Sequence, residues 1–332
     1  MTQQAPAFDP FPAAGDGPAP RVLLLGASGF IGGHVLAALA TTGASVTAVC
    51  RRPPQARPAT EALLAGQGGQ VDWRVTPVHG LTTREAWQPL LETVDVVINC
   101  VGILRQRPSE SYEDVHHHMP RALAQACAQH RVRLIHTSAL GLHENAKSRF
   151  LSSKLRGEQA VAASGADHCI VRPSLIDGRG GFGASWLRSL ARSPVHFVPS
   201  GARGRIAAVQ ATDLGEAYAR LAHLGSLGEW REANLGGTRD YRYGEYLQLL
   251  RGVGDADQPA APAWQVPLPD WGTRLGAHLC DLFRFSPFSY GHWILLQRDN
   301  LPRPNALPAL LGREPRAVTR TQDHRLADFR LS

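Results

Sequence analysis

The chain has 332 residues, of which 43% are hydrophobic, so it is long enough to bury a full core. Its formal net charge is +7, and the basic residues are spread along the sequence instead of forming one block. The sequence contains no helix-turn-helix, zinc-finger or aromatic–basic sheet motif, which argues against nucleic-acid binding. A basic surface of this kind suits anionic phosphates, anionic lipid or an acidic protein partner.

Cysteine usage and hydropathy predict a cellular location. Five widely scattered cysteines form no CxxC pair, and three of them fall inside apolar strand or helix patterns, which is typical of a reducing compartment. The first residues do not show a basic region followed by an apolar one, and the sequence has no membrane-length apolar run, so we expect neither a signal peptide nor a membrane span. We therefore expect a cytoplasmic protein, and attachment to the inner face of the cell membrane as a peripheral protein stays an open alternative.

The first structured segment carries the main ligand signal. Residues 1–20 are rich in Pro, Ala and Gly without periodicity, which predicts a disordered tail. The apolar run 22–25 predicts a buried parallel strand, three glycines follow it at intervals of three, and a helix is predicted over 30–41. A pyrophosphate can approach bare amides at a helix N-terminus where no Cβ intervenes. A phosphate-bearing dinucleotide is therefore the first ligand predicted.

Strands and helices then alternate up to residue 173. Further strands are predicted at 45–50, 71–75, 95–103, 133–138 and 169–173, and helices near 58–66 and at 83–92, 111–130 and 148–164. Strands separated by helices of this length predict right-handed crossovers and an α/β fold, a Rossmann-type doubly wound parallel sheet.

After residue 178 the regular alternation stops. A loop at 178–183 and irregular chain at 194–205 accompany helices at 184–192, 212–221 and 243–251 and one strand at 229–236, with Thr212-Asp213 as a helix cap. We predict a Rossmann domain over 21–178 and a small C-terminal lid or substrate region over 179–332. Within that region, residues of about 206–240 are expected to return to the Rossmann core.

Several motifs together resemble the extended short-chain dehydrogenase/reductases: GASGFIGG, NCVGIL, HTSALG and VRPS. More narrowly, DVVINCVGIL, EDVHHHMPRALAQA, SRFLSSKLRGE and RDNLPRPNALP are similar to the atypical branch that contains the nucleotide-binding accessory subunit of respiratory complex I and its bacterial relatives. The resemblance covers roughly residues 20 to 315, and its motifs are specific in combination although each is weak alone.

The resemblance implies a set of cofactor-binding residues: Gly26, Ser28, Gly29, Phe30, Ile31, Gly32, Arg51, Arg52, Cys100, Val101, Gly102, Lys154 and Pro173. At the end of the second strand of this fold, a carboxylate binds the ribose 2′-OH and an arginine pairs with a 2′-phosphate. The chain has Cys50-Arg51-Arg52 there and no carboxylate. NADP(H) is therefore the preferred prediction and NAD(H) the alternative, while a solvated loop is the simpler explanation of the two arginines.

Active members of this family use a Ser, a Tyr and a Lys four residues after the Tyr. Ser138 matches the serine and Lys154 the lysine, but position 150 is phenylalanine. The general acid that accompanies hydride transfer is thereby missing, a loss worth about a hundredfold to ten-thousandfold in rate. Tyr112 and His143 are the candidate substitutes, so the sequence leaves open whether the protein is an enzyme.

Three hypotheses follow from these residues. The leading one is an NADP(H)-binding protein with a degenerate catalytic motif, in which the nucleotide is structural or regulatory, acting as an accessory or assembly factor of a respiratory complex. The second is an active NAD(P)-dependent oxidoreductase, epimerase or dehydratase that uses Ser138 and Lys154. The third is a membrane-surface or protein-docking module in 264–298, where aromatic residues cluster: Trp264, Trp271, Phe283, Phe285, Phe288 and Trp293.

The run His116-His117-His118 looks like a metal cluster. Adjacent residues on an α-helix point in different directions, so they cannot all reach one ion. We expect no metal site there, and either a solvated or a cofactor-facing helix start.

Overall fold

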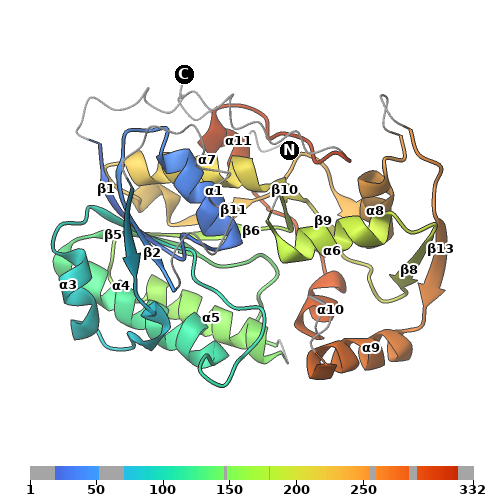
Figure 1. The fold of residues 1–332 in the computed structure, drawn as a ribbon, viewed down its shortest axis with the longest axis horizontal. Helices are drawn as coiled ribbons and strands as arrows, with labels where there is room; N and C mark the ends of the chain where they lie inside the picture. Colours follow the sequence, from blue (N-terminus) through green and yellow to red (C-terminus); the bar gives the residue numbers. More distant parts are fainter. Residues whose placement is uncertain are drawn as a thin grey trace, which may run out of the picture.

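The computed structural model describes residues 19–51, 71–145, 148–178, 180–254, 259–283 and 290–320, and only the backbone of 277–283 and 290–292. A seven-stranded sheet forms its centre (Figure 1), in the order β11-β6-β5-β4-β1-β2-β3, and every neighbouring pair is parallel. The strands are β1 (Arg21–Leu25), β2 (Ser45–Cys50), β3 (Val71–Val75), β4 (Val96–Asn99), β5 (Arg133–Thr137), β6 (His168–Pro173) and β11 (Glu232–Leu235). This confirms the predicted Rossmann-type α/β fold.

Helices cover both faces of the sheet (Figure 1). On one face lie α1 (Phe30–Leu39), α7 (Ala211–His223) and α11 (Leu307–Leu311), and on the other α3 (Gln88–Leu91), α4 (Met119–His130) and α5 (Arg149–Ala162). Strand β1 shows why both faces of the sheet must be covered by helices. Val22 and Leu24 belong to one buried cluster, and Leu23 and Leu25 belong to the other. A strand buried on both faces requires such an unbroken apolar run.

The C-terminal part packs around a third buried cluster, built by α6 (Phe182–Ala191), α8 (Tyr243–Arg251) and neighbouring loops. The expectation of irregular chain at 194–205 was wrong, because β8 (Val195–Pro199) pairs in parallel with β13 (Trp264–Leu268). The partner strand lies far along the chain, so no local pattern announces the pair. Further elements are α9 (Asp270–Phe283), α10 (Tyr290–Leu296) and the short pairs β7 (Ile176–Asp177) with β10 (Val209–Gln210) and β9 (Arg205–Ile206) with β12 (Tyr241–Arg242).

Two predicted helices differ in detail from the observed ones. The segment 83–92 is a 3₁₀ turn, η3 (Glu85–Trp87), followed by the single turn of α3. The helix predicted over 111–130 begins with a π-helical turn, η4 (Asp114–His118), before α4. Short 3₁₀ turns also occur at η2 (Val78–Gly80) and η5 (Gly228–Trp230).

The proposed cap of the helix at 212–221 was wrong. Helix α7 begins at Ala211 with Gln210 at its N-cap, and Asp213 caps nothing. Its fully buried carboxylate instead accepts hydrogen bonds from Arg313 Nη2 at 2.9 Å and Arg316 Nη1 at 3.0 Å, which hold the C-terminal segment against α7. Three predictions lie outside the described residues: the tail at 1–20 apart from its last two residues, the helix near 58–66, and the role of Arg52.

None of the helices in the described ranges has both the length and the apolar character that crossing a bilayer requires.

Candidate cofactor and substrate site

The glycine turn after β1 is shaped for an anion. Gly26 has φ of 79°, a left-handed conformation that favours glycine. A Cβ added at Gly32 would lie 2.2 Å from the Gly26 carbonyl oxygen, so α1 packs against the turn as closely as a bare backbone permits. Helix α1 begins at Phe30 without a side-chain cap, which leaves its first amides available to a phosphate group. These features fit the pyrophosphate of a dinucleotide.

A cleft of about 80 Å³ opens beside this turn, at the carboxyl ends of β1, β2 and β4, where open α/β sheets bind nucleotides. Seven predicted cofactor residues line it: Gly26, Ser28, Gly29, Arg51, Cys100, Val101 and Gly102. Gly32 does not line it and acts through packing. The predicted set of cofactor residues lacked Cys50, next to Arg51, and three polar residues from other segments: Thr76, His79 and Glu110.

Arg51, the residue expected to meet a 2′-phosphate, is already paired. Its Nη1 forms an ion pair with Glu110 Oε1, and the Glu110 side chain is only 7% exposed. Arg107 and Glu110 exchange backbone hydrogen bonds of 3.0 Å, which fix this acid in the loop after β4. No sequence pattern announces such a contact, because 59 residues separate the two partners.

A second hollow, an apolar cavity of about 350 Å³, is lined by the first residues of α1. The two hollows adjoin: Gly29 and Ile103 line the cleft, and their chain neighbours Phe30 and Leu104 line the cavity. Six predicted site residues belong to the cavity: Phe30, Ile31, Ser138, Phe150, Lys154 and Pro173. The rest of its wall is mainly aliphatic and aromatic, and among the described residues no arginine and no carboxylate lines it. The cavity therefore suits an apolar molecule.

Ser138 does not aim its proton into the cavity. Its Oγ donates to Glu158 Oε2 at 2.6 Å, and Glu158 Oε1 accepts from Arg172 Nη2 at 2.5 Å. Arg172 also binds Glu232 at 2.6 Å, which continues the network to the surface. Glu158 follows Lys154 by one turn of α5, and this spacing is the one signal by which the sequence could have revealed it.

Lys154 is the one cation among the described residues of the cavity wall. Burial lowers the pKa of its ammonium to about 8, although the Glu158 carboxylate opposes the shift. His116 and His136 lie near it, and burial lowers the pKa of both rings, that of His136 to about 3. Both imidazoles are therefore neutral at physiological pH, so Lys154 carries the positive charge of this region.

Phe150, which the sequence predicts at the position of the family's tyrosine, offers no hydroxyl. Its ring packs edge-on against Tyr112 and His116, with centroid distances of 5.7 and 5.5 Å. The Tyr112 hydroxyl donates to the Leu104 carbonyl oxygen at 2.8 Å, and neither Tyr112 nor His143 lines the cavity. The two substitutes suggested by the sequence are thus not positioned for proton transfer.

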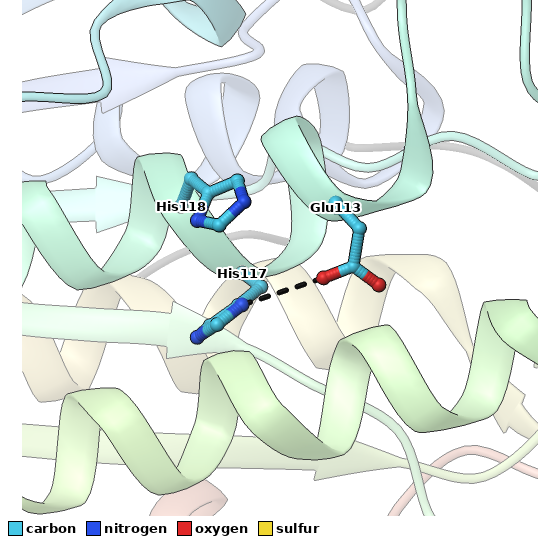
Figure 2. Close-up of side chains that lie close together, drawn as sticks. All are labelled: Glu113, His117 and His118. Atoms are coloured by element: carbon cyan, nitrogen blue, oxygen red, sulfur yellow. Dashed lines mark ion pairs between the residues drawn. The ribbon is translucent and has the colours of Figure 1, made fainter.

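The histidine run divides into two parts. His116 points inward, where its Nε2 accepts from the Ile103 amide at 3.1 Å. Figure 2 shows that His117 and His118 instead lie near Glu113, with candidate ligand atoms within 4.8 Å of one another. A π-helical turn contains more residues than an α-helical turn. The residues four and five positions after Glu113, which are His117 and His118, therefore both lie on the side of the helix that carries Glu113. Glu113 is also paired with Arg156, which competes with a cation, and we assign no ligand role to this cluster.

The fold and the site define a class of protein. A family model described as NAD(P)H-binding matches residues 26–209, and the chain belongs to this family, with the fold of the extended short-chain dehydrogenase/reductases. The chain is similar over most of its length to the ceramide reductase of Caulobacter vibrioides. The two are 31% identical over 268 residues, which cover 78% of this chain and 77% of the relative.

Two further proteins, one compared by sequence and one by structure, are similar to this chain. The NADH-ubiquinone oxidoreductase 40 kDa subunit of Neurospora crassa is 28% identical over 201 residues, 60% of this chain and 51% of that protein. Among solved structures, the UDP-glucose 4-epimerase of Bifidobacterium longum in complex with NAD⁺ and UDP has a TM-score of 0.62 at 17% identity, and the match covers 90% of this chain and 95% of that one. The resemblance to the respiratory complex I subunits and their relatives is confirmed.

Proposed function

We propose that the protein is an NAD(P)H-dependent reductase of an apolar carbonyl compound, such as a long-chain ketone. The observation that carries this proposal is the 350 Å³ cavity, which adjoins the nucleotide cleft. The described residues of its wall are mainly apolar, and one of them carries an ammonium group, Lys154. The ceramide reductase relative, whose name refers to a lipid, supports the same substrate class.

The chemistry of the wall argues against a nucleotide-sugar substrate. Sugar hydroxyls and a diphosphate need several hydrogen-bond donors, acceptors and cations around them. In the described part of this cavity, polar side-chain groups come only from Lys154, Ser138, Ser174, Asn300, Tyr243 and the indole N–H of Trp186. Ser138 and Ser174 donate their hydroxyl protons to protein oxygens, so little is left to satisfy a sugar.

Proton supply is the step that Phe150 cannot perform. The cleft would hold NAD(P)H, and this cofactor would supply the hydride for the carbonyl carbon. The Lys154 ammonium donates one N–H proton to the carbonyl oxygen, so that the product is an alcohol and the lysine is left as a neutral amine. Water returns a proton to this amine. Ser138 acts as a positioning residue, because its hydrogen bond fixes Glu158 one helical turn from Lys154.

The test is oxidation of NADH and NADPH by the purified protein with a long-chain ketone and with a short polar ketone. We expect turnover with the long-chain ketone only, and loss of that turnover on Lys154→Met. Nucleotide binding without turnover of any long-chain ketone would contradict the proposal.

A second candidate is a nucleotide-binding accessory or assembly factor of a respiratory complex, with NADP(H) bound for structure or regulation. Phe150 favours it, since a binding protein needs no proton donor, and so does the similarity to a subunit of NADH-ubiquinone oxidoreductase. Its signature would be a nucleotide that is released on denaturation and is never consumed. A gain of turnover on Phe150→Tyr would then indicate a decayed enzyme.

Exposed aromatic residues support a peripheral attachment to a membrane. Trp264 is 80% exposed and shares a face of β13 with Val266, beside the exposed Phe197 of β8, while Trp271, 73% exposed, lies on α9. Trp293 is buried and belongs to the core, and the side chains of Phe283, Phe285 and Phe288 lie outside the described residues. Tryptophan side chains favour the bilayer interface, from which an apolar substrate would enter.

Flotation with vesicles containing anionic phospholipid tests this attachment. We expect the unaltered protein to float with the vesicles and a variant carrying Trp264→Ser and Trp271→Ser to remain behind. The control is Phe182→Ser, which removes another exposed aromatic ring, 63% exposed, from α6. Equal flotation of all three proteins would count against the surface.

A further inference from the structure

Glu110 is an acid that reaches the nucleotide cleft from an unexpected direction. It lies in the loop between β4 and η4, not at the end of β2, where this fold usually carries the carboxylate that reads the adenosine ribose. The backbone bridge between Arg107 and Glu110 fixes its position, and its side chain forms part of the cleft wall. The same cleft is lined by Cys50 and Arg51, the last residue of β2 and the one after it.

The carboxylate of Glu110 is only half satisfied. Oε1 accepts from the Arg51 guanidinium, whereas Oε2 is buried and has no hydrogen-bond partner among the described residues. Buried charged oxygens are normally hydrogen-bonded, because leaving them unpaired costs free energy. An ionised carboxylate accepts hydrogen bonds and donates none. The group that completes this site must therefore be a donor.

The adenosine half of a nicotinamide dinucleotide offers such a donor at this place. Its ribose lies at the end of the second strand, and in NAD(H) that ribose carries a free 2′-OH. In NADP(H) the same position holds a phosphate with a charge of about −1.5 to −2 and only acceptor oxygens near neutral pH. A hydroxyl can donate to Glu110 Oε2, whereas a phosphate is repelled by it.

Arg51 does not reverse the preference for a hydroxyl as long as Arg51 is paired with Glu110. Two opposite charges that lie equally close to a third act on it with similar strength and opposite sign, so repulsion of a 2′-phosphate by Glu110 offsets its attraction by Arg51. A 2′-phosphate would also have to break the existing ion pair before Arg51 could turn to it. The arginine that predicted NADP(H) from the sequence is thus neutralised by its partner.

We propose that Glu110 is the specificity-determining residue of the cofactor site, and that it selects the free 2′-OH of NAD(H) against the 2′-phosphate of NADP(H). The proposal opposes the NADP(H) preference predicted from Arg51 and Arg52. It rests only on nucleotide binding, so it holds or fails independently of the proposed reductase activity.

Dissociation constants for NADH and NADPH, measured by nucleotide fluorescence without any carbonyl substrate, test the proposal. The unaltered protein should bind NADH at least as tightly as NADPH. Glu110→Gln keeps the shape of the side chain but removes its charge and frees Arg51. It should shift the ratio of the two constants toward NADPH by about tenfold or more, a change of about 1.4 kcal/mol.

Two further variants make the test decisive. Glu92→Gln removes one carboxylate from an exposed position outside the cleft and should leave the ratio unchanged. Arg51→Gln in the Glu110→Gln background should abolish the gain for NADPH, since it removes the released cation. An unchanged ratio in Glu110→Gln, or an unaltered protein that prefers NADPH by tenfold or more, would overturn the proposal.

Discussion

The nucleotide cleft and the apolar cavity adjoin, yet they are built by different means. The cleft is formed largely by backbone and small residues at the ends of neighbouring parallel strands, with Gly26 and Gly32 setting its shape. The cavity is formed by side chains from segments as distant as Phe30 and Asn300. A shared cofactor can be bound by backbone amides common to a family, whereas a substrate must be distinguished by side chains.

This difference predicts how the two regions respond to mutation. Changes in the cleft should act on nucleotide affinity, and changes in the cavity on turnover and substrate affinity with the nucleotide still bound. A cleft variant that altered substrate affinity, or a cavity variant that altered nucleotide affinity, would show that the two hollows form one functional unit.

The largest effect is expected for Lys154→Met, which keeps much of the side-chain volume but removes the ammonium. Turnover of a long-chain ketone should fall by about a hundredfold to ten-thousandfold, the usual contribution of a general acid, while the dissociation constant of the nucleotide changes far less. Steady-state kinetics and nucleotide titration measure the two quantities. A parallel loss of binding would instead make Lys154 mainly a ribose ligand.

The same lysine predicts a pH profile. Its pKa is lowered to about 8, and the protonated form is the acid, so activity should be retained below pH 8 and lost as the pH rises through about 8. Lys154→Arg, which stays protonated at all these pH values, should lack this alkaline loss in whatever activity remains. A profile of the unaltered protein that is flat across pH 8 would contradict the role of Lys154.

The next effect in size is expected for Gly32→Ala, because the added Cβ would meet the Gly26 carbonyl oxygen. Overpacking against backbone costs about 1–3 kcal/mol, so affinity for NADH should fall by roughly tenfold to a hundredfold as the turn is displaced. Gly225→Ala is the control, since a Cβ there meets nothing within 4 Å. Equal affinities of the two variants would mean that the packing of α1 does not shape the cleft.

A smaller effect is expected for Ala184→Asp, which places a charge in the apolar wall. The KM for a long-chain ketone should rise by about tenfold or more, because a buried charge without a partner disfavours hydrocarbon beside it. Ser185→Asp, on the exposed side of the same helix, is the matched control. Nucleotide affinity should be the same in both variants, and a KM unaffected by Ala184→Asp would place the substrate elsewhere.

The smallest effect is expected away from both hollows. Asp213→Ala removes the carboxylate that binds Arg313 and Arg316, both of which are partly exposed and can be hydrated. The free energy of unfolding should fall by about 1–2 kcal/mol, and Tm by roughly 2–4 °C, with nucleotide affinity unchanged. Thermal melts of this variant and of the surface control Asp240→Ala make the comparison.

The sequence by itself determined the Rossmann sheet, because each buried strand needs an unbroken apolar run and each crossover a helix, and both are local patterns. It also identified the glycine turn, and most of the site residues that it predicted line the cleft or the cavity, since backbone requirements are written in residue type at fixed spacing. The parallel pair of β8 and β13 escaped it, as did the π turn that brings His117 and His118 beside Glu113.

Only the tertiary structure decided the partners of individual charges. Arg51 appeared free in the sequence and is held by Glu110, and Asp213 appeared to be a cap and binds two arginines about a hundred residues away. Ion pairs and cavity walls depend on which distant side chains meet, and residue order does not encode that meeting locally. For this reason the class of ligand could be predicted from the chain, while the chemistry of its selection could be proposed only from the folded molecule.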